Sequence, residues 1–119
     1  MDLIIGGYAQ GKLSYALEYF KLSESDVSCA VLSDKRIVYG LEKFILSAGD
    51  GAEKLIEAFV ENNPEAVLIC AEAGCGIVPL DKGERGYRER VGRICCALAK
   101  KAERVHRVFC GVGTVIKGG

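Results

Sequence analysis

Short continuous apolar runs alternate along the chain with stretches in which apolar residues recur at helical spacing. The runs predict five strands, at residues 3–5, 29–32, 37–39, 66–71 and 105–110. Apolar residues three and four positions apart predict four helices, over 12–21, near 41–46, over 52–62 and about 84–103. Asp50 is expected to cap the third of these helices. Because strands and helices alternate, the pattern predicts an α/β fold with a mostly parallel sheet.

The run at 66–71 does not alternate between apolar and polar residues, which is typical of a strand buried on both faces of a parallel sheet. The order of strands around residues 28–46 stays open, because 32–36 is compatible with either a hairpin turn or a crossover.

The length of 119 residues fits one domain, and we expect residues 1–119 to form it. Half of the residues are hydrophobic and 27% are charged, as in an ordinary globular protein. The apolar runs are far shorter than the roughly 20 residues that span a membrane, and the first residues do not resemble a signal peptide. We therefore expect a cytoplasmic protein with no membrane partner.

Charge is distributed unevenly although the formal net charge is zero. Residues 1–80 carry a net charge of −6 and residues 81–119 a net charge of +6. The basic third indicates an anionic ligand, an acidic face of another subunit, or simply a solvated helix face. The neutral balance and the absence of a reading motif argue against a nucleic-acid partner.

Six cysteines and one histidine do not have the spacing of a structural metal site, because no Cys-x-x-Cys pair exists. We therefore predict no metal-ligating residues. Four of the cysteines, Cys29, Cys70, Cys95 and Cys110, stand in apolar stretches and are expected to be buried, reduced thiols.

A glycine-rich segment between the first predicted strand and the first predicted helix carries the clearest chemistry. It matches G-x-x-x-x-G-K, the start of a phosphate-binding loop, in which backbone N–H groups and a lysine surround a phosphate. Its candidate nucleotide-binding residues are Gly6, Gly7, Tyr8, Ala9, Gln10, Gly11, Lys12 and Leu13. The alternative is a glycine turn with no ligand.

The last position of the phosphate-loop pattern is altered. A hydroxyl normally follows the lysine and holds magnesium, but this chain has Leu13 there. Ser14 comes one residue late, which rotates it by about 100° on a helix. Phosphate binding is compatible with this change, whereas efficient phosphoryl transfer is harder to support.

The C-terminal part resembles the adenosylcobinamide kinase/adenosylcobinamide-phosphate guanylyltransferase family of cobalamin biosynthesis. The residues that carry the resemblance are Glu72-x-Gly74-x-Gly76-Ile77-Val78-Pro79, Arg85, Tyr87-Arg88, Gly92-Arg93-Ile94, Ala99, Val105 and Gly111-x-Gly113. The segment Gly6–Lys12 also looks like this family's phosphate loop.

The resemblance implies a three-layer P-loop (RecA-like) fold, ATP or GTP as ligand, a corrinoid pathway and a homo-oligomer, specifically a trimer. On this basis Lys12 and Glu72 are the candidate catalytic residues. Glu72 is the remaining carboxylate near the strand ends, where ligands of parallel sheets bind. A hydrogen-bond acceptor that only anchors its loop is an equal alternative for Glu72. Arg85 and Arg88 could add positive charge there, although solvated side chains or subunit contacts fit them better.

The chain also departs from the family. It is shorter, and the missing segment falls between the second strand and Glu72, where the family has a histidine that is guanylylated. The single histidine, His106, is expected to be an ordinary strand residue. Tyr39 takes the place of an acidic metal-binding residue, and Cys95 replaces an asparagine.

Three hypotheses remain open. The first is a diverged member that binds a nucleotide or another phosphate ligand, with guanylyl transfer lost and kinase activity doubtful. The second is an active adenosylcobinamide kinase whose magnesium is carried by the nucleotide phosphates without its usual protein ligands. The third is a non-catalytic oligomeric partner or regulatory protein.

Overall fold

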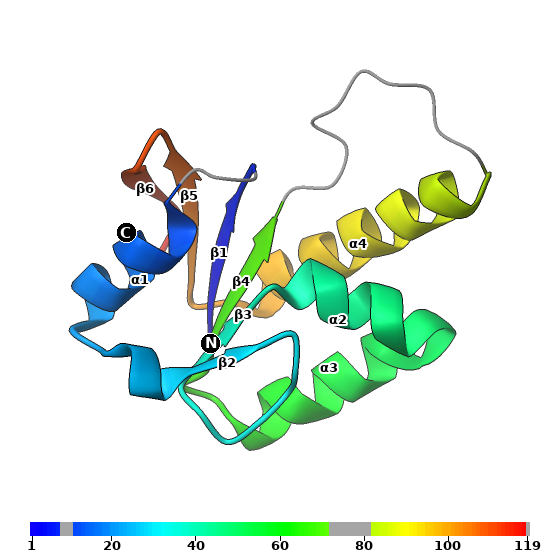
Figure 1. Ribbon diagram of the computed structural model, residues 1–119, viewed down its shortest axis with the longest axis horizontal. Helices are drawn as coiled ribbons and strands as arrows, with labels where there is room; N and C mark the ends of the chain where they lie inside the picture. The colour runs from blue at the N-terminus through cyan, green and yellow to red at the C-terminus, as the bar shows by residue number, and fades with distance from the viewer. Residues whose placement is uncertain (8–10, 72–81, 119) are drawn as a thin grey trace.

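The computed structural model describes residues 1–7, 11–71 and 82–118 (Figure 1). In chain order its helices and strands are β1 (Asp2–Gly6), α1 (Lys12–Phe20), β2 (Val27–Cys29), β3 (Ile37–Tyr39), α2 (Leu41–Ala48), α3 (Ala52–Asn62), β4 (Val67–Ala71), α4 (Lys82–Lys101), β5 (Arg104–Phe109) and β6 (Val112–Lys117). Short 3-10 turns at Glu24–Asp26 and Gly49–Gly51 precede β2 and α3. None of the described helices is long and apolar enough to cross a membrane.

The strands form one sheet in the order β2-β3-β4-β1-β5-β6. The pairs from β2 to β5 are all parallel, and only β6 runs antiparallel to its neighbour. This arrangement confirms the predicted α/β fold with a mostly parallel central sheet. All five residues of β4 are buried, as the unbroken apolar run predicted.

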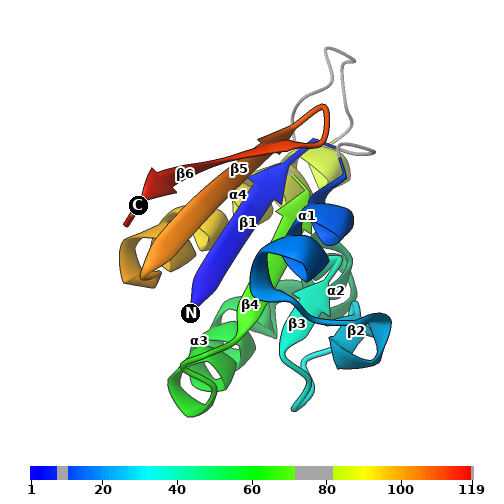
Figure 2. The same ribbon diagram turned by 90° about the vertical axis from the view of Figure 1, so that its left-hand side faces the viewer.

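Helices cover both faces of the sheet and give the predicted three layers. Figures 1 and 2 show α2, α3 and α4 on one face and α1 on the other. The larger core cluster joins Leu3, Leu68 and Val105 to the three-helix side. The smaller cluster joins Ile4 and Ile69 to α1. Successive strand residues therefore alternate between the two cores.

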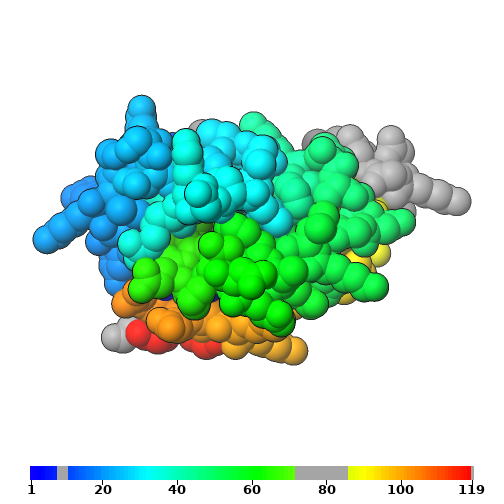
Figure 3. Space-filling view, turned by 90° about the horizontal axis from the view of Figure 1, so that it is seen from below, coloured from blue at the N-terminus to red at the C-terminus, as the bar shows by residue number. Residues whose placement is uncertain are grey.

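Parallel strands β2 and β3 are joined by residues 30–36 alone. A connection between adjacent parallel strands usually takes a dozen or more residues and contains a helix. The segment is therefore a very short crossover and not a hairpin turn. It lies in the part of the chain where the family resemblance indicated a missing segment. In Figure 3 this cyan loop lies on the surface beside the green segments.

Two strand predictions need correction. β2 ends at Cys29 and does not reach residue 32, because Ala30 adopts a positive φ of 59° that turns the chain out of the sheet. β6 was not predicted, because the glycines at 111 and 113 suggested a loop. Cys110 and Gly111 both have positive φ, which is the geometry of a tight turn between antiparallel strands.

Two of the four cysteine predictions were wrong. Cys70 is buried and Cys95 is half-buried, but Cys29 and Cys110 are exposed. Cys29 ends a three-residue strand at the edge of the sheet, and Cys110 lies in the β5–β6 turn. Neither place lets a side chain reach a core.

The opposite charges of the two parts of the chain meet along α4. Arg90 contacts Asp50 at 2.9 Å, Arg93 contacts Glu53 at 3.7 Å, and Lys101 lies 4.0 Å from Glu57. Asp50 is therefore an ion-pair partner and not the predicted cap, and Gly51 occupies the cap position of α3. Exposed pairs of this kind each contribute at most about 1 kcal/mol.

Candidate functional site

The carboxyl ends of β1, β3 and β4 meet at one edge of the sheet, where ligands of parallel α/β proteins bind. Gly6 ends β1 and pairs in register with Ala71, which ends β4. Glu42 follows β3 in the first turn of α2. The ends of β1 and β4 and the first turn of α2 therefore position the candidate site.

The ends of the predicted phosphate loop lie between β1 and α1. Gly6 and Gly7 leave β1, and Gly11 precedes α1 with a φ of 81°, a value that favours glycine. Lys12 is the first residue of α1 and is 6% exposed. Its Nζ donates a hydrogen bond to the Gly7 carbonyl at 2.6 Å. The lysine ammonium is therefore directed back toward the end of β1.

The other predicted loop residues fall into two groups. Leu13 is half-buried and packs against the α1-side core, so the position after the lysine offers no oxygen ligand. Ser14, one residue later, is exposed. Tyr8, Ala9 and Gln10 lie outside the described residues, and so does the candidate catalytic residue Glu72.

A buried carboxylate at this edge was missed by sequence reasoning. Glu42 is only 4% exposed, and its Oε1 accepts a hydrogen bond from the Ala71 N–H at 2.9 Å. The backbone carbonyl oxygen of Glu42 accepts a hydrogen bond from the Tyr87 hydroxyl at 2.7 Å, which connects α4 to α2. The only available signal was a glutamate beside the apolar residues of a short helix, and that pattern also fits a solvated side chain.

The charges of Lys12 and Glu42 both act on the buried thiol of Cys70, in β4. A hydrogen bond with Cys95 and burial raise the pKa of this thiol, and the negative charge of Glu42 raises it further. The positive charge of Lys12 acts in the opposite direction. Lys12 and Glu42 therefore act on the same point at the end of β4.

Comparison with known proteins identifies the family. The model of the cobinamide kinase/cobinamide phosphate guanyltransferase family matches residues 42–116, which is more than half of the chain. The chain belongs to this family. The matched segment begins at Glu42, so Gly6–Leu13 lie before it.

Two curated proteins of cobalamin biosynthesis are similar to the chain. The bifunctional adenosylcobalamin biosynthesis protein CobU of Salmonella typhimurium is 37% identical over 68 residues, 57% of this chain. The bifunctional protein CobP of Pseudomonas aeruginosa is 33% identical over 66 residues, 56% of this chain. Each match spans 38% of the relative's own length, so the chain corresponds to well under two thirds of either protein.

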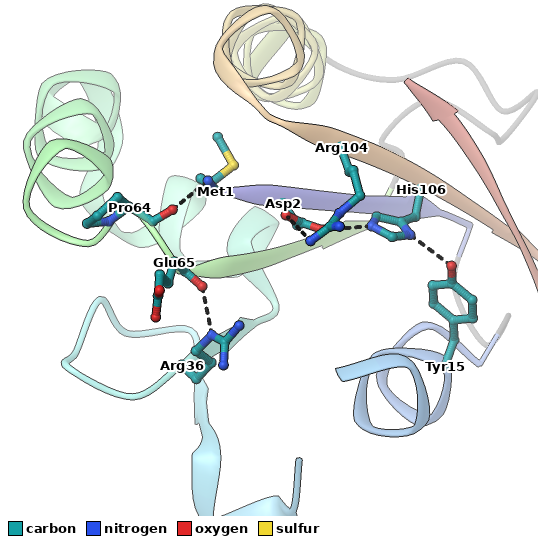
Figure 4. A network of polar contacts seen from close by, with 8 residues as sticks. All are labelled: Met1, Asp2, Tyr15, Arg36, Pro64, Glu65, Arg104 and His106. Carbon is teal, nitrogen blue, oxygen red and sulfur yellow. Dashed lines mark hydrogen bonds and ion pairs between the residues drawn. The ribbon is translucent and has the colours of Figure 1, made fainter. Parts of the chain in front are cut away.

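The single histidine of this family member lies in a buried part of the sheet. His106 is in β5, as predicted, beside Ile4 and fully buried. Its Nε2 donates to Asp2 Oδ2 at 2.9 Å, because the carboxylate can only accept, and its Nδ1 shares a hydrogen bond of 2.8 Å with the Tyr15 hydroxyl (Figure 4).

Asp2 is the centre of this buried network. Arg104 Nε also donates to Asp2 Oδ2, at 2.8 Å (Figure 4). Burial alone would raise the pKa of Asp2, but the hydrogen bonds and charges of Arg104 and His106 outweigh it and lower the pKa below 3.8. Burial raises the pKa of Tyr15, and the charges of Tyr19 and Asp2 raise it further, so its hydroxyl stays protonated.

The lowered pKa of Asp2 predicts a loss of stability in acid. A carboxylate with a lowered folded pKa contributes fully above its unfolded pKa, and the contribution is lost as the pH falls through the folded value. We expect the free energy of unfolding to decrease below about pH 4. Other carboxylates titrate there too, so the free energy of unfolding in urea should be measured as a function of pH for both wild type and Asp2→Asn. The same decrease of this free energy with falling pH in both proteins would contradict the prediction.

Proposed function

We propose that this family member binds a nucleoside triphosphate, ATP or GTP, through Gly6–Leu13 in one P-loop domain. The observation that carries the proposal is the strand–loop–helix geometry, in which Gly11 lies in the left-handed region and Lys12 begins a helix. Backbone N–H groups at a helix start, together with a lysine, favour a phosphate ligand. Membership of a cobinamide kinase family supports a corrinoid as the second ligand.

We further propose that guanylyl transfer has been lost. A histidine that accepts a nucleotidyl group must expose a ring nitrogen, whereas His106 is fully buried and has both nitrogens hydrogen-bonded. The chain contains no other histidine. Lys12 can bind and orient a phosphate, but the chain offers no second histidine as the nucleophile.

Kinase activity is a second candidate, with Lys12 and Glu72 as its proposed catalytic residues. Magnesium would supply charge neutralisation of the phosphates, but Leu13 and Tyr39 occupy the positions of its usual ligands. The described residues contain no group of three metal-ligating side chains. These positions do not fit a directly held ion, so we assign no step to magnesium.

Calorimetric titration of ATP and GTP tests nucleotide binding. We expect the wild type to bind with a dissociation constant near 1 μM, about −8 kcal/mol. Lys12→Ala should weaken binding about a hundredfold, because it removes the cation that contacts the outer phosphates. Lys54→Ala, an exposed lysine on α3, is the control and should bind as the wild type does.

Absence of binding to both nucleotides, or unchanged affinity in Lys12→Ala, would refute the proposal. The outcome would then favour a non-catalytic role as an oligomeric partner, such as the trimer that the family resemblance implies. If ATP binds, incubation with adenosylcobinamide and stoichiometric protein separates the remaining alternatives. Phosphorylated corrinoid would establish kinase activity, and none would leave a nucleotide-binding protein.

A further inference from the structure

We propose that a cavity at the amino-terminal edge of the sheet binds a small zwitterion of the amino-acid type, which carries a carboxylate and an ammonium group close together. The cavity has a volume of about 330 Å³, which suits a small metabolite. The residues that line it include Met1, Asp2, Arg36, Glu65, Glu103 and Arg104. It lies at the starts of β1, β4 and β5, whereas the phosphate loop follows the opposite end of β1.

Backbone hydrogen bonds hold the walls of this cavity together. The Met1 nitrogen donates to the Pro64 carbonyl at 2.6 Å (Figure 4), and the Glu103 N–H donates to the Met1 carbonyl at 2.9 Å. The Asp2 N–H donates to the Ala66 carbonyl at 3.0 Å. These contacts join the residues that precede or begin β1, β4 and β5. The cavity is therefore built by the sheet itself, which lowers the cost of ordering a binding site.

Arg36 brings to this cavity a guanidinium group that is oriented but not neutralised. Its Nε donates to the Glu65 carbonyl oxygen at 2.8 Å (Figure 4). The guanidinium carbon lies over the Phe20 ring, 5.8 Å from its centre. Among residues 1–7, 11–71 and 82–118, its two terminal nitrogens have no hydrogen-bond partner and the group makes no ion pair. These nitrogens can therefore donate to a ligand carboxylate in the bidentate geometry that arginine favours.

Arg104 supplies a second guanidinium group to the same cavity. Its Nε donates to Asp2 Oδ2 at 2.8 Å, and one terminal nitrogen lies 3.5 Å from Asp2 Oδ1. The other terminal nitrogen has no partner in the described part of the chain, and the side chain is 39% exposed. Because Asp2 offsets its charge, Arg104 acts as a further hydrogen-bond donor beside Arg36 and not as a second free cation.

The carboxylates of Glu65 and Glu103 decide the class of ligand. Both residues are exposed, and neither carboxylate makes a hydrogen bond or an ion pair with a described residue. The side chains that line the cavity comprise two guanidinium groups and three carboxylates, so a simple anion would meet a net negative lining. A simple cation would be repelled by Arg36. A zwitterion matches both signs, with its carboxylate at Arg36 and its ammonium group toward the two glutamates.

Three small molecules test this charge requirement. L-alanine carries both charges, propionate lacks the ammonium group, and ethylamine lacks the carboxylate. We expect L-alanine to bind with a dissociation constant of about 1 mM, and the other two to bind at least tenfold more weakly. Binding is followed by NMR on ¹⁵N-labelled protein at neutral pH, where the Nε–H signals of Arg36 and Arg104 should shift on addition of L-alanine.

Three variants locate the site. Arg36→Gln removes the exposed guanidinium group and should weaken L-alanine binding at least tenfold. Glu65→Gln removes a carboxylate but keeps the backbone carbonyl that holds Arg36, so it should weaken L-alanine binding and leave propionate binding equal or stronger. Arg93→Gln on α4, an exposed arginine whose partner is Glu53, is the matched control and should bind L-alanine as the wild type does.

Absence of any shift of the Arg36 and Arg104 signals at roughly 50 mM L-alanine would overturn the inference. Propionate or ethylamine that binds as tightly as L-alanine would also overturn it, because one charge would then be sufficient. Unchanged affinity in folded Arg36→Gln would exclude this cavity as the site. Because the titration contains no nucleotide, its outcome does not depend on the phosphate loop, and either proposal can fail while the other stands.

Discussion

Replacing His106 by alanine is expected to lower the free energy of unfolding by about 3 to 4 kcal/mol. The substitution empties a fully buried site and removes two hydrogen bonds, to Asp2 and to the Tyr15 hydroxyl. It also leaves the Asp2 carboxylate, whose side chain is 7% exposed, with Arg104 as its remaining side-chain partner. Urea unfolding at neutral pH measures the effect.

Tyr15→Phe and Thr114→Ala provide the comparison for this result. Tyr15→Phe removes one hydrogen bond and should lower the free energy of unfolding by about 1 to 2 kcal/mol. In the double variant of Tyr15→Phe and His106→Ala, the loss should be smaller than the sum of the two single losses. Thr114 is exposed on β6, so its alanine variant should stay within about 0.5 kcal/mol of wild type. A cost for His106→Ala as small as that of Thr114→Ala would show that the network does not stabilise the fold.

This network has a consequence for the candidate site because Tyr15 belongs to the helix that Lys12 begins. The Asp2–His106–Tyr15 contacts join α1 to β1 and β5 across the face opposite the three-helix core. They hold the first turn of α1, which Lys12 begins, against the sheet. Both ring nitrogens of His106 are used in these contacts.

Local patterns predicted most of the fold. Runs of apolar residues located β1, β3 and β4, and helical spacing located α1, α3 and α4, because each element buries a face that its own sequence displays. β6 was not predicted because this strand forms only by pairing with β5 after a turn with positive φ angles at Cys110 and Gly111. The displacement of β2 has the same kind of cause, a turn at Ala30.

The candidate site was predictable only where its residues are neighbours in the sequence. The phosphate-loop pattern is local, and the structure shows its described ends between β1 and α1 as the pattern required. Glu42 contacts a residue 29 positions away, and His106 contacts one 104 positions away. Without the sheet order, nothing in the sequence pairs these residues. The family match supports the segment that follows β3, and it does not reach the loop.

Gly6→Ala is expected to reduce both stability and nucleotide affinity. A Cβ at this position would lie 2.5 Å from the Val108 carbonyl oxygen and 3.3 Å from Lys12 Cδ. The first neighbour is backbone of β5, so it cannot rotate away, and β1 and β5 would have to separate. Overpacking of this kind costs about 1 to 3 kcal/mol. We expect a loss near the upper end in urea unfolding and at least a tenfold loss of ATP affinity by calorimetry.

The same substitution at Gly92 has the opposite expected sign, which makes it the control for Gly6→Ala. Gly92 is exposed in the interior of α4, and a Cβ there would meet nothing within 4 Å. Alanine should therefore stabilise the helix by about 0.5 to 1 kcal/mol and leave ATP binding unchanged. The pair distinguishes a close approach of backbones at Gly6 from a general effect of adding a methyl group. Wild-type stability and affinity in Gly6→Ala would mean that β5 does not approach the start of the loop as closely as the Val108 carbonyl does in this structure.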